Sequence, residues 1–394
     1  MFIEIIFACI LGISLGIISG IIPGIHINLL SALVLSLSPF LLHYFSPLIL
    51  ACFILAIAIT HTFIDVLPTT FLGIPDASNA LLLFPSQKMV LQGKGYEAIF
   101  LILTGGLGSL LFSFLFLPLF FISTGILYPY LEKFVGWILL FICLFLLLRE
   151  KEKIWASIIF LLSGCLGLIV FSLPLEQGLF PLFSGLFGVS MLVLSFKNTL
   201  SIPPQEETIP TLDGVYKAIP CASIIGWIAS FMPGLGPAQA ASIGTNFVKL
   251  DEKGYLLLIG GLSTVNMLLS LLSFYLFDKT RNGALVIVAQ FLKIDFFSFL
   301  ILLFVALSAG GIACFLSLFF SKKFLQVIPR LPYKTFTLSV IIFICLLVIL
   351  LTGWLGFFIL FVSTALGILP EVRNVAKSHM MGCLLIPVML FFLF

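Results

Sequence analysis

The sequence predicts an all-α integral membrane protein with about 12–14 hydrophobic segments in two inverted-topology repeats with broken or re-entrant helices. Three observations predict it: the composition is strongly apolar, long apolar runs recur along the chain, and a Pro-Gly motif occurs twice. Hydrophobic residues make up 61% of the 394 positions and charged residues 9%, whereas soluble domains carry about 25% charged residues. A helix needs about 20 apolar residues to cross a bilayer core.

Apolar segments divide the chain into two halves, residues 1–196 and 218–394, joined by a polar linker at 197–217 that we expect to be cytoplasmic. Each half contains seven segments. In the first half they cover residues 2–22, 25–42, 47–72, 97–122, 134–148, 154–173 and 178–196. In the second half they cover residues 218–232, 236–248, 255–277, 296–320, 335–351, 353–369 and 380–394.

Short motifs recur between the halves at a slowly shrinking distance. Pro23 and Pro233 lie 210 positions apart, and the Gly-Gly pairs at 105–106 and 310–311 lie 205 apart. The Leu-Pro pairs at 173–174 and 369–370 lie 196 apart. Duplication followed by shortening of loops leaves such a pattern. Because seven is odd, the second half is expected to enter the membrane from the opposite side. A re-entrant hairpin formed by the first two segments would not change this parity.

The distribution of basic residues predicts the orientation, since Lys and Arg concentrate in cytoplasmic loops. With the N-terminus outside, only Lys133, Lys279, Arg281 and Lys293 of the 19 Lys and Arg are external. The other 15 fall in loops of the cytoplasmic side. We therefore expect a multi-pass protein of the cell membrane with an external N-terminus.

The two Pro-Gly motifs are candidate helix breaks for substrate binding. Proline removes a backbone donor, glycine permits left-handed backbone angles, and the N-terminus of the following helix attracts anions. Paired breaks in inverted halves are typical of transporter binding sites. A kinked structural helix pair is the alternative. The candidate substrate-binding residues in and after the motifs are Pro23, Gly24, His26, Asn28, Pro233, Gly234, Gly236, Pro237 and Gln239.

A polar cluster within the third segment is the candidate cation-coupling site. His61 and Asp65 are four residues apart and therefore share one helical face, and Thr60 precedes them. Ionisable residues inside a membrane are costly and mark functional sites. A coupling proton on the His-Asp pair, Na⁺ on Asp65, and an interfacial pair without function all stay open. The counterparts in the second half are Ser263, Thr264 and Asn266.

Asn79 and Asn282 occupy corresponding positions after the third segments and are further candidate substrate ligands. An amide can bind carboxylates or cations, and Arg281 could clamp a carboxylate. Each stretch is also consistent with a plain loop.

Several other classes of function are disfavoured. The chain has no HExxH zinc motif and no GxSxG serine motif, and its four histidines are scattered, so we expect no enzyme and no metal site. Seven of the eight cysteines lie in apolar runs without CxxC pairing, and no disulfide is expected. No basic run indicates nucleic-acid binding. We expect no cofactor other than Na⁺ or H⁺ as the coupling ion.

The sequence stretches Pro-Gly-Ile-His-Ile-Asn at 23–28 and Ser-Phe-Met-Pro-Gly-Leu-Gly-Pro-Ala-Gln at 230–239 carry a resemblance to a known family. They resemble the large membrane subunit (TctA) of the tripartite tricarboxylate transporters, and most closely its shorter archaeal-type relatives. The resemblance implies carboxylate uptake driven by a Na⁺ or H⁺ gradient. It also implies a small membrane subunit and a solute-binding protein as partners. The first motif departs from the Gly-Leu-Gly-Pro of many relatives.

Taken together, the sequence predicts a secondary active transporter that imports a carboxylate or another small organic anion coupled to Na⁺ or H⁺. A lipid or lipid-linked-substrate flippase is the alternative, because it would also use a polar groove between inverted halves. The expected partners are the lipid bilayer and the organic anion, with a homodimer left open.

Overall fold

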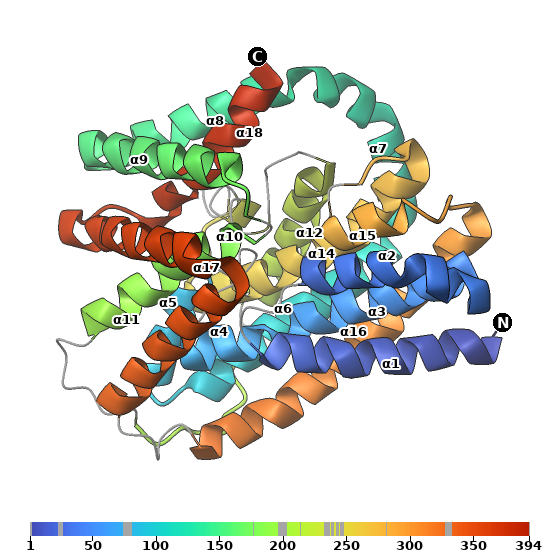
Figure 1. The fold of residues 1–394 in the computed structure, drawn as a ribbon, viewed down its shortest axis with the longest axis horizontal. Helices are drawn as coiled ribbons and strands as arrows, with labels where there is room; N and C mark the ends of the chain where they lie inside the picture. Colours follow the sequence, from blue (N-terminus) through green and yellow to red (C-terminus); the bar gives the residue numbers. More distant parts are fainter. Residues whose placement is uncertain are drawn as a thin grey trace.

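The computed structural model shows a helical protein (Figure 1). It describes residues 2–22, 27–73, 81–175, 177–195, 203–212, 214–231, 237, 240–241, 244, 248–280, 282–327 and 333–393. Over these residues the regular elements are helices. The prediction of an all-α membrane protein is therefore confirmed.

The helices form two groups, which we name the central bundle and the lateral bundle. The central bundle consists of α1 (Phe2–Ile21), α2 (Ile27–Tyr44), α3 (Pro47–Ile64), α4 (Val66–Leu72), α5 (Leu83–Leu91), α6 (Gly95–Leu115), α7 (Leu117–Leu131), α12 (Val215–Phe231), α14 (Glu252–Phe277), α15 (Gly283–Val288) and α16 (Phe296–Val327). The lateral bundle consists of α8 (Val135–Arg149), α9 (Lys153–Ser172), α10 (Leu179–Phe183), the π-helical turn Ser184–Val189, α11 (Ser190–Ser195), α17 (Tyr333–Arg373), the 3₁₀ turn Lys377–Met381 and α18 (Gly382–Leu393).

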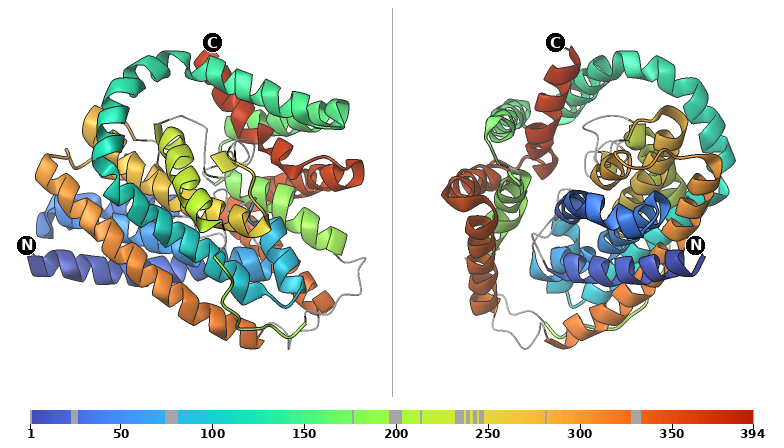
Figure 2. Two further views of the ribbon diagram at one scale, coloured as in Figure 1. Left: turned by 180° about the vertical axis from the view of Figure 1, so that it is seen from behind. Right: turned by 45° about the vertical axis from the view of Figure 1, so that its right-hand side comes forward.

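Extensive helix contacts among the described residues lie within each bundle rather than between them. The right-hand view of Figure 2 shows α8, α9, α17 and α18 as a layer beside the helices of the central bundle. A 91° bend between α7 and α8 carries the chain from one bundle to the other. Each bundle therefore contains helices from both halves of the sequence.

Seven helices of the described chain are long and apolar enough to cross a membrane. Their burial differs widely: 94% of the most apolar stretch of α14 is buried, against 22% for α17. The segments predicted at 335–351 and 353–369 form the two helical arms of α17, which meet at a kink where Gly353 has non-helical angles (φ 67°, ψ −166°). Because a positive φ strains residues that have a Cβ, glycine is required at this kink.

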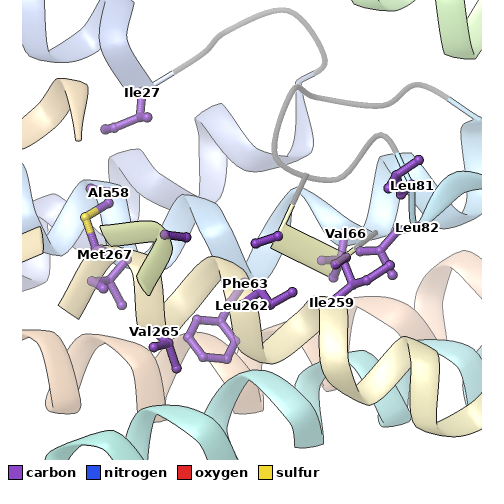
Figure 3. Close-up of a cluster of buried hydrophobic side chains, with 14 of the residues drawn as sticks. Ile27, Ala58, Phe63, Val66, Leu81, Leu82, Ile259, Leu262, Val265 and Met267 are labelled. Atoms are coloured by element: carbon purple, nitrogen blue, oxygen red, sulfur yellow. The ribbon is translucent and has the colours of Figure 1, made fainter. Parts of the chain in front are cut away.

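Glycines determine how closely the central helices approach. A Cβ on Gly105 of α6 would lie 2.0 Å from the Leu257 carbonyl oxygen of α14, and a Cβ on Gly260 would lie 2.1 Å from the Ile102 carbonyl oxygen. The α6 and α14 backbones are thus in contact, as small residues allow in membrane helices. Side chains of α3 and α14, including Ala58, Phe63, Leu262 and Met267, fill the same apolar cluster (Figure 3).

Ion pairs mark one end of the central bundle, which we name the linker end. Lys253 at the start of α14 lies 2.6 Å from Glu97 at the start of α6. Phe71 of α4 stacks on Phe324 near the end of α16, with ring centroids 5.5 Å apart. The side chain of Gln205, in residues 203–212, accepts from the Gly95 N–H and donates to the Val90 carbonyl, both at 2.9 Å. Hence α6 and α14 begin at the linker end, where α16 and the α3–α4 run finish.

Candidate functional site

The polar part of α3 lies where that helix gives way to α4. Asp65 is the single residue between the two helices and caps α3 through its N–H, which bonds to the His61 carbonyl at 2.9 Å. Pro68 has no N–H for the carbonyl of Ile64, four residues earlier, so a regular helix cannot continue through this point. The Thr69 hydroxyl donates to the Asp65 carbonyl at 2.9 Å. The sequence thus places an acidic side chain at a helix junction.

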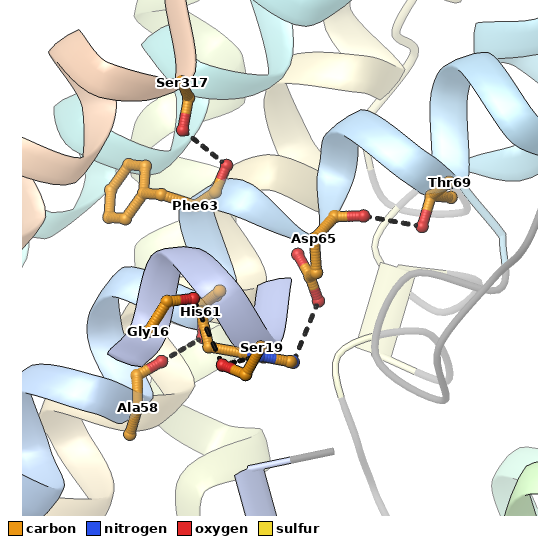
Figure 4. A network of polar contacts seen from close by, with 9 residues as sticks. Gly16, Ser19, Ala58, His61, Phe63, Asp65, Thr69 and Ser317 are labelled. Carbon is orange, nitrogen blue, oxygen red and sulfur yellow. Dashed lines mark hydrogen bonds and ion pairs between the residues drawn. The ribbon is translucent and has the colours of Figure 1, made fainter. Parts of the chain in front are cut away.

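His61, Asp65 and Ser19 form a buried polar chain at the contact of α1 with α3 (Figure 4). The Ser19 hydroxyl lies 3.0 Å from His61 Nδ1, and His61 Nε2 lies 3.9 Å from Asp65 Oδ2. The three residues are 2%, 5% and 5% exposed. In such low-dielectric surroundings an ionised group is expensive unless it is paired. The charge and the hydrogen bonds of these three side chains therefore change when one proton is added or removed.

A glycine stripe on α1 brings Ser19 to this position. The stripe consists of Gly12, Gly16 and Gly20, and a Cβ on any of them would lie 2.6–2.7 Å from a side-chain carbon of α3. The facing pairs are Gly12 with Ala56, Gly16 with Thr60 and Gly20 with Ile64. Because the residue numbers rise together on both helices, α1 and α3 run in the same direction. The stripe replaces side-chain volume with backbone contact and allows the serine hydroxyl to reach the imidazole.

A second group of polar side chains lies on another face of α3, toward α6 and α14. A cavity of about 10 Å³ opens there between Thr62, Gly106, Ser263 and Thr264, among other residues, which is about the space of one water molecule. The Thr264 hydroxyl donates to the Gly106 carbonyl at 2.9 Å. The Ser263 hydroxyl is buried without a hydrogen-bond partner among the described residues.

Comparison with known proteins decides the family. The family model of the tripartite tricarboxylate transporter TctA family matches residues 6–382. The chain belongs to the TctA family. An uncharacterized protein of Methanocaldococcus jannaschii is 31% identical over 401 residues, covering 98% of both chains. No solved structure matches. TctA proteins are transporter components, so the prediction of a membrane transport protein rather than an enzyme is confirmed.

Most of the Pro-Gly motif residues of this TctA protein lie outside the described residues. These are Pro23, Gly24, His26, Pro233, Gly234, Gly236 and Gln239, together with Asn79 and Arg281. Asn28 is in the first turn of α2, which begins directly after the first motif. Pro237 is partly buried. The substrate-binding assignments therefore stay predictions.

Five of the six predicted cation-coupling residues fall into two places, and Asn266 lies in neither. Thr60, His61 and Asp65 lie on the α1 side of α3, whereas Ser263 and Thr264 line the cavity toward α6. The Thr60 hydroxyl has no hydrogen-bond partner within the described parts of the chain. Asn266 of α14 is partly exposed, and a Cβ on Gly226 of α12 would lie 3.7 Å from its backbone nitrogen. The six residues are thus not one site.

Asn282 caps a helix in this TctA protein. Its Oδ1 accepts from the Ala284 N–H at 3.0 Å at the start of α15, and its carbonyl accepts from the Thr280 hydroxyl at 3.1 Å. A ligand of Asn282 would therefore meet the amide Nδ2 group. The predicted substrate contact stays a prediction.

Ser19 is the residue that sequence reasoning missed. A serine in an apolar helix is common and carries no signal alone. The signal lay in the spacing of Gly12, Gly16 and Gly20, one every four residues, which is a helix-packing stripe. Ser19 precedes the last of these glycines and lies on the edge of the packed face.

Proposed function

We propose that this chain is a secondary active transporter that imports a carboxylate or another small organic anion together with Na⁺ or H⁺. The observation that carries the proposal is the buried His61–Asp65 pair, with 3.9 Å between Nε2 and Oδ2. It lies in a span whose most apolar stretch is 78% buried. Ionisable groups inside a membrane are costly and mark functional sites, and this pair offers a carboxylate and an imidazole that can bind a proton or a metal cation.

The proposed division into repeats 1–196 and 218–394 is supported by an exchange of helix contacts. Contact of α1 with α3 in the first half corresponds to contact of α12 with α14 in the second. Contact of α6 with α14 corresponds to contact of α16 with α3. Corresponding helices also point in opposite directions, since α14 begins at the linker end where the α3–α4 run finishes. Inverted repeats of this kind allow two nearly equivalent conformations.

The orientation that we propose has the linker end in the cytoplasm and the N-terminus outside. Lys88, Lys253 and Lys322 lie at the linker end, where they pair with Glu252, Glu97 and Glu207. Because α1 runs parallel to α3, its N-terminus lies at the opposite end. These lysines agree with the positive-inside rule, which counts Lys and Arg and gives little weight to Asp and Glu.

In the proposed mechanism, the helix starts that follow the two Pro-Gly motifs hold the carboxylate, and the cation binds on α3. Partial positive charge at a helix N-terminus favours an anion without a basic side chain. The separation into central and lateral bundles, each with helices from both halves, supports movement of one bundle against the other. The family description names a tripartite system, so we propose a small membrane subunit and a solute-binding protein as partners.

Thermal unfolding of the purified full-length protein tests the proposal. Citrate, succinate and glutamate are each added with and without Na⁺ at pH 6 and pH 8. A ligand of the folded state raises the apparent melting temperature, and a carboxylate shift that grows with Na⁺ or acid is expected. Stabilisation by phospholipids alone would overturn the carboxylate proposal and favour a flippase.

A further inference from the structure

The Ser19 hydroxyl has one proton and two neighbours that can accept it. The Ser19 oxygen lies 3.1 Å from the Gly16 carbonyl oxygen of its own helix and 3.0 Å from His61 Nδ1. A carbonyl can only accept, whereas a ring nitrogen can accept or donate. Both contacts are satisfied together when the hydroxyl donates to Gly16 and Nδ1–H donates to the hydroxyl oxygen. Ser19 thus favours one tautomer of His61.

This tautomer determines what His61 presents to Asp65. With the proton on Nδ1, Nε2 of the neutral ring carries a lone pair and faces Oδ2 of the carboxylate at 3.9 Å. Two acceptors repel each other, and 3.9 Å is too long for a hydrogen bond. A proton that binds to Nε2 gives an imidazolium, and the repulsion becomes an ion pair with the carboxylate. Ser19 still accepts from Nδ1–H in that state, and a hydrogen bond from a charged donor is stronger than one from a neutral donor.

We infer that the coupling ion is a proton, taken up between His61 Nε2 and Asp65 Oδ2, and that Ser19 is a positioning residue that fixes the tautomer of His61. The inference rests on the proposed function and names its cation.

Other charged groups on the helices packed against α3 lie near helix ends. Glu4 of α1 is fifteen residues before Ser19, about 22 Å along the helix. His43 is in the last turn of α2, and Glu252 and Lys253 are in the first turn of α14. Near the end of α16, Lys322 pairs with Glu207, and Lys323 lies over the Phe319 ring. The helices α4 and α15 carry no charged side chain. The His61–Asp65 pair is therefore the ionisable group in the described middle of α3 and its neighbours.

Nitrogen NMR of the full-length protein in lipid nanodiscs tests the tautomer without any substrate. The chain has four histidines, so the His61 signals can be assigned as those lost in the His61→Gln variant. At high pH the wild type is expected to show His61 protonated on Nδ1, and acid is expected to add the second proton at Nε2. A wild-type His61 protonated on Nε2 at high pH would overturn the inference, whether or not any variant folds.

Ser19→Ala sharpens the test. Loss of the oxygen that accepts from Nδ1–H is expected to mix the tautomers. Ser14→Ala is the matched control: Ser14 lies on the same helix, is exposed, and its hydroxyl donates to the Ile10 carbonyl at 2.9 Å. Identical tautomer populations of His61 in Ser19→Ala and Ser14→Ala would contradict a positioning role.

Uptake of radiolabelled citrate into proteoliposomes separates this inference from the proposed function. An imposed pH gradient at constant Na⁺ is expected to drive uptake, and Ser19→Ala is expected to change the pH profile of uptake, whereas Ser14→Ala is not. Uptake that follows only a Na⁺ gradient would refute the proton and leave the transporter intact. No uptake of citrate, succinate or glutamate even when the small membrane subunit and the solute-binding protein are present, with the expected NMR result, would instead refute the proposed function.

Discussion

Two helix pairs of the central bundle, α6 with α14 and α16 with α3, are built in the same way. Each pair runs in parallel and has a glycine at its contact: a Cβ on Gly105 would lie 2.0 Å from the Leu257 carbonyl oxygen of α14, and a Cβ on Gly310 would lie 3.3 Å from the Phe63 ring of α3. Each pair is also joined by a hydroxyl that donates to a backbone carbonyl of the partner helix. These bonds run from Thr264 to Gly106 at 2.9 Å and from Ser317 to Phe63 at 2.8 Å.

The pairs differ in the chemistry of the most buried member. α3 carries His61 and Asp65, whose charge can change, whereas the corresponding α14 carries Ser263 and Thr264, which stay neutral. The two pairs thus share the same kind of packing, but at the middle of these four described helices acidic and imidazole side chains occur only on α3. Under the proposed function, α14 supports the structure and α3 responds to the cation.

The largest expected effect comes from breaking the shared packing. Gly260→Leu would place a Cβ 2.1 Å from the Ile102 carbonyl oxygen, and backbone cannot move aside cheaply. We expect a loss of more than about 3 kcal/mol of stability or no folded protein. Gly311→Leu is the control, because a Cβ there has no atom within 4 Å among the described residues. The monodisperse fraction after purification and the melting temperature measure both, and equal behaviour would refute the close contact.

The next effect should distinguish the two helices by activity. Asp65→Asn removes the carboxylate that pairs with His61, and we expect citrate uptake to fall roughly 100-fold, equivalent to about 2.7 kcal/mol. Thr264→Val on α14 should change the rate by less than about threefold. Asp278→Asn, at the exposed end of α14, controls for the general loss of a carboxylate. Initial uptake rates at equal protein density give the comparison, and equal losses in Asp65→Asn and Thr264→Val would abolish the proposed division of roles.

A smaller effect concerns the two interhelical hydroxyls. Thr264→Val and Ser317→Ala should each lower the unfolding free energy by about 1–2 kcal/mol, because each leaves a buried carbonyl with one donor fewer. If the two pairs are independent supports, the double variant should lose the sum of the single losses. Chemical denaturation in mild detergent provides the values. A double variant no less stable than either single variant would show that the bonds act as one unit.

The smallest expected effect is at the start of α16. Asp295 Oδ1 accepts from the Ser298 N–H at 2.9 Å, and hydrogen bonds from Ser298 hold the pKa of Asp295 below its ordinary value of 3.8. Since the folded-state pKa is lowered, the cap stabilises above the ordinary pKa and is lost as the pH falls through the lowered value. Asp295→Ala should melt slightly earlier than the wild type at pH 7. The difference should shrink below pH 3.8; an unchanged difference would argue against a charged cap.

The sequence predicted the helical membrane class and most helix limits, because long apolar runs leave few other structures possible in a bilayer. It also predicted that His61 and Asp65 share a helical face, since local spacing determines this. It did not predict that α3 ends at Asp65, although Pro68 supplies the reason. Nor did it divide the helices between two bundles, because packing partners depend on contacts between distant segments.

The candidate site was predictable only in part for the same reason. Helical spacing gave the pair on α3, but the partner of His61 comes from α1, more than forty residues earlier. Ser263 and Thr264 were grouped with that pair because they are counterparts in sequence. In the structure, Ser263 and Thr264 line a cavity toward α6, whereas His61 and Asp65 lie on the α1 side of α3.

The interleaving of both halves in each bundle has a consequence for biogenesis. α8–α11 leave the ribosome long before α17 and α18, against which they pack. The first half of the lateral bundle must therefore wait in the bilayer with its packing face covered by lipid until translation is nearly complete. A premature stop codon after α16 would leave the helices of the central bundle present and the lateral bundle half-made. Quality-control proteases would then meet an orphaned lateral half rather than a wholly unfolded chain.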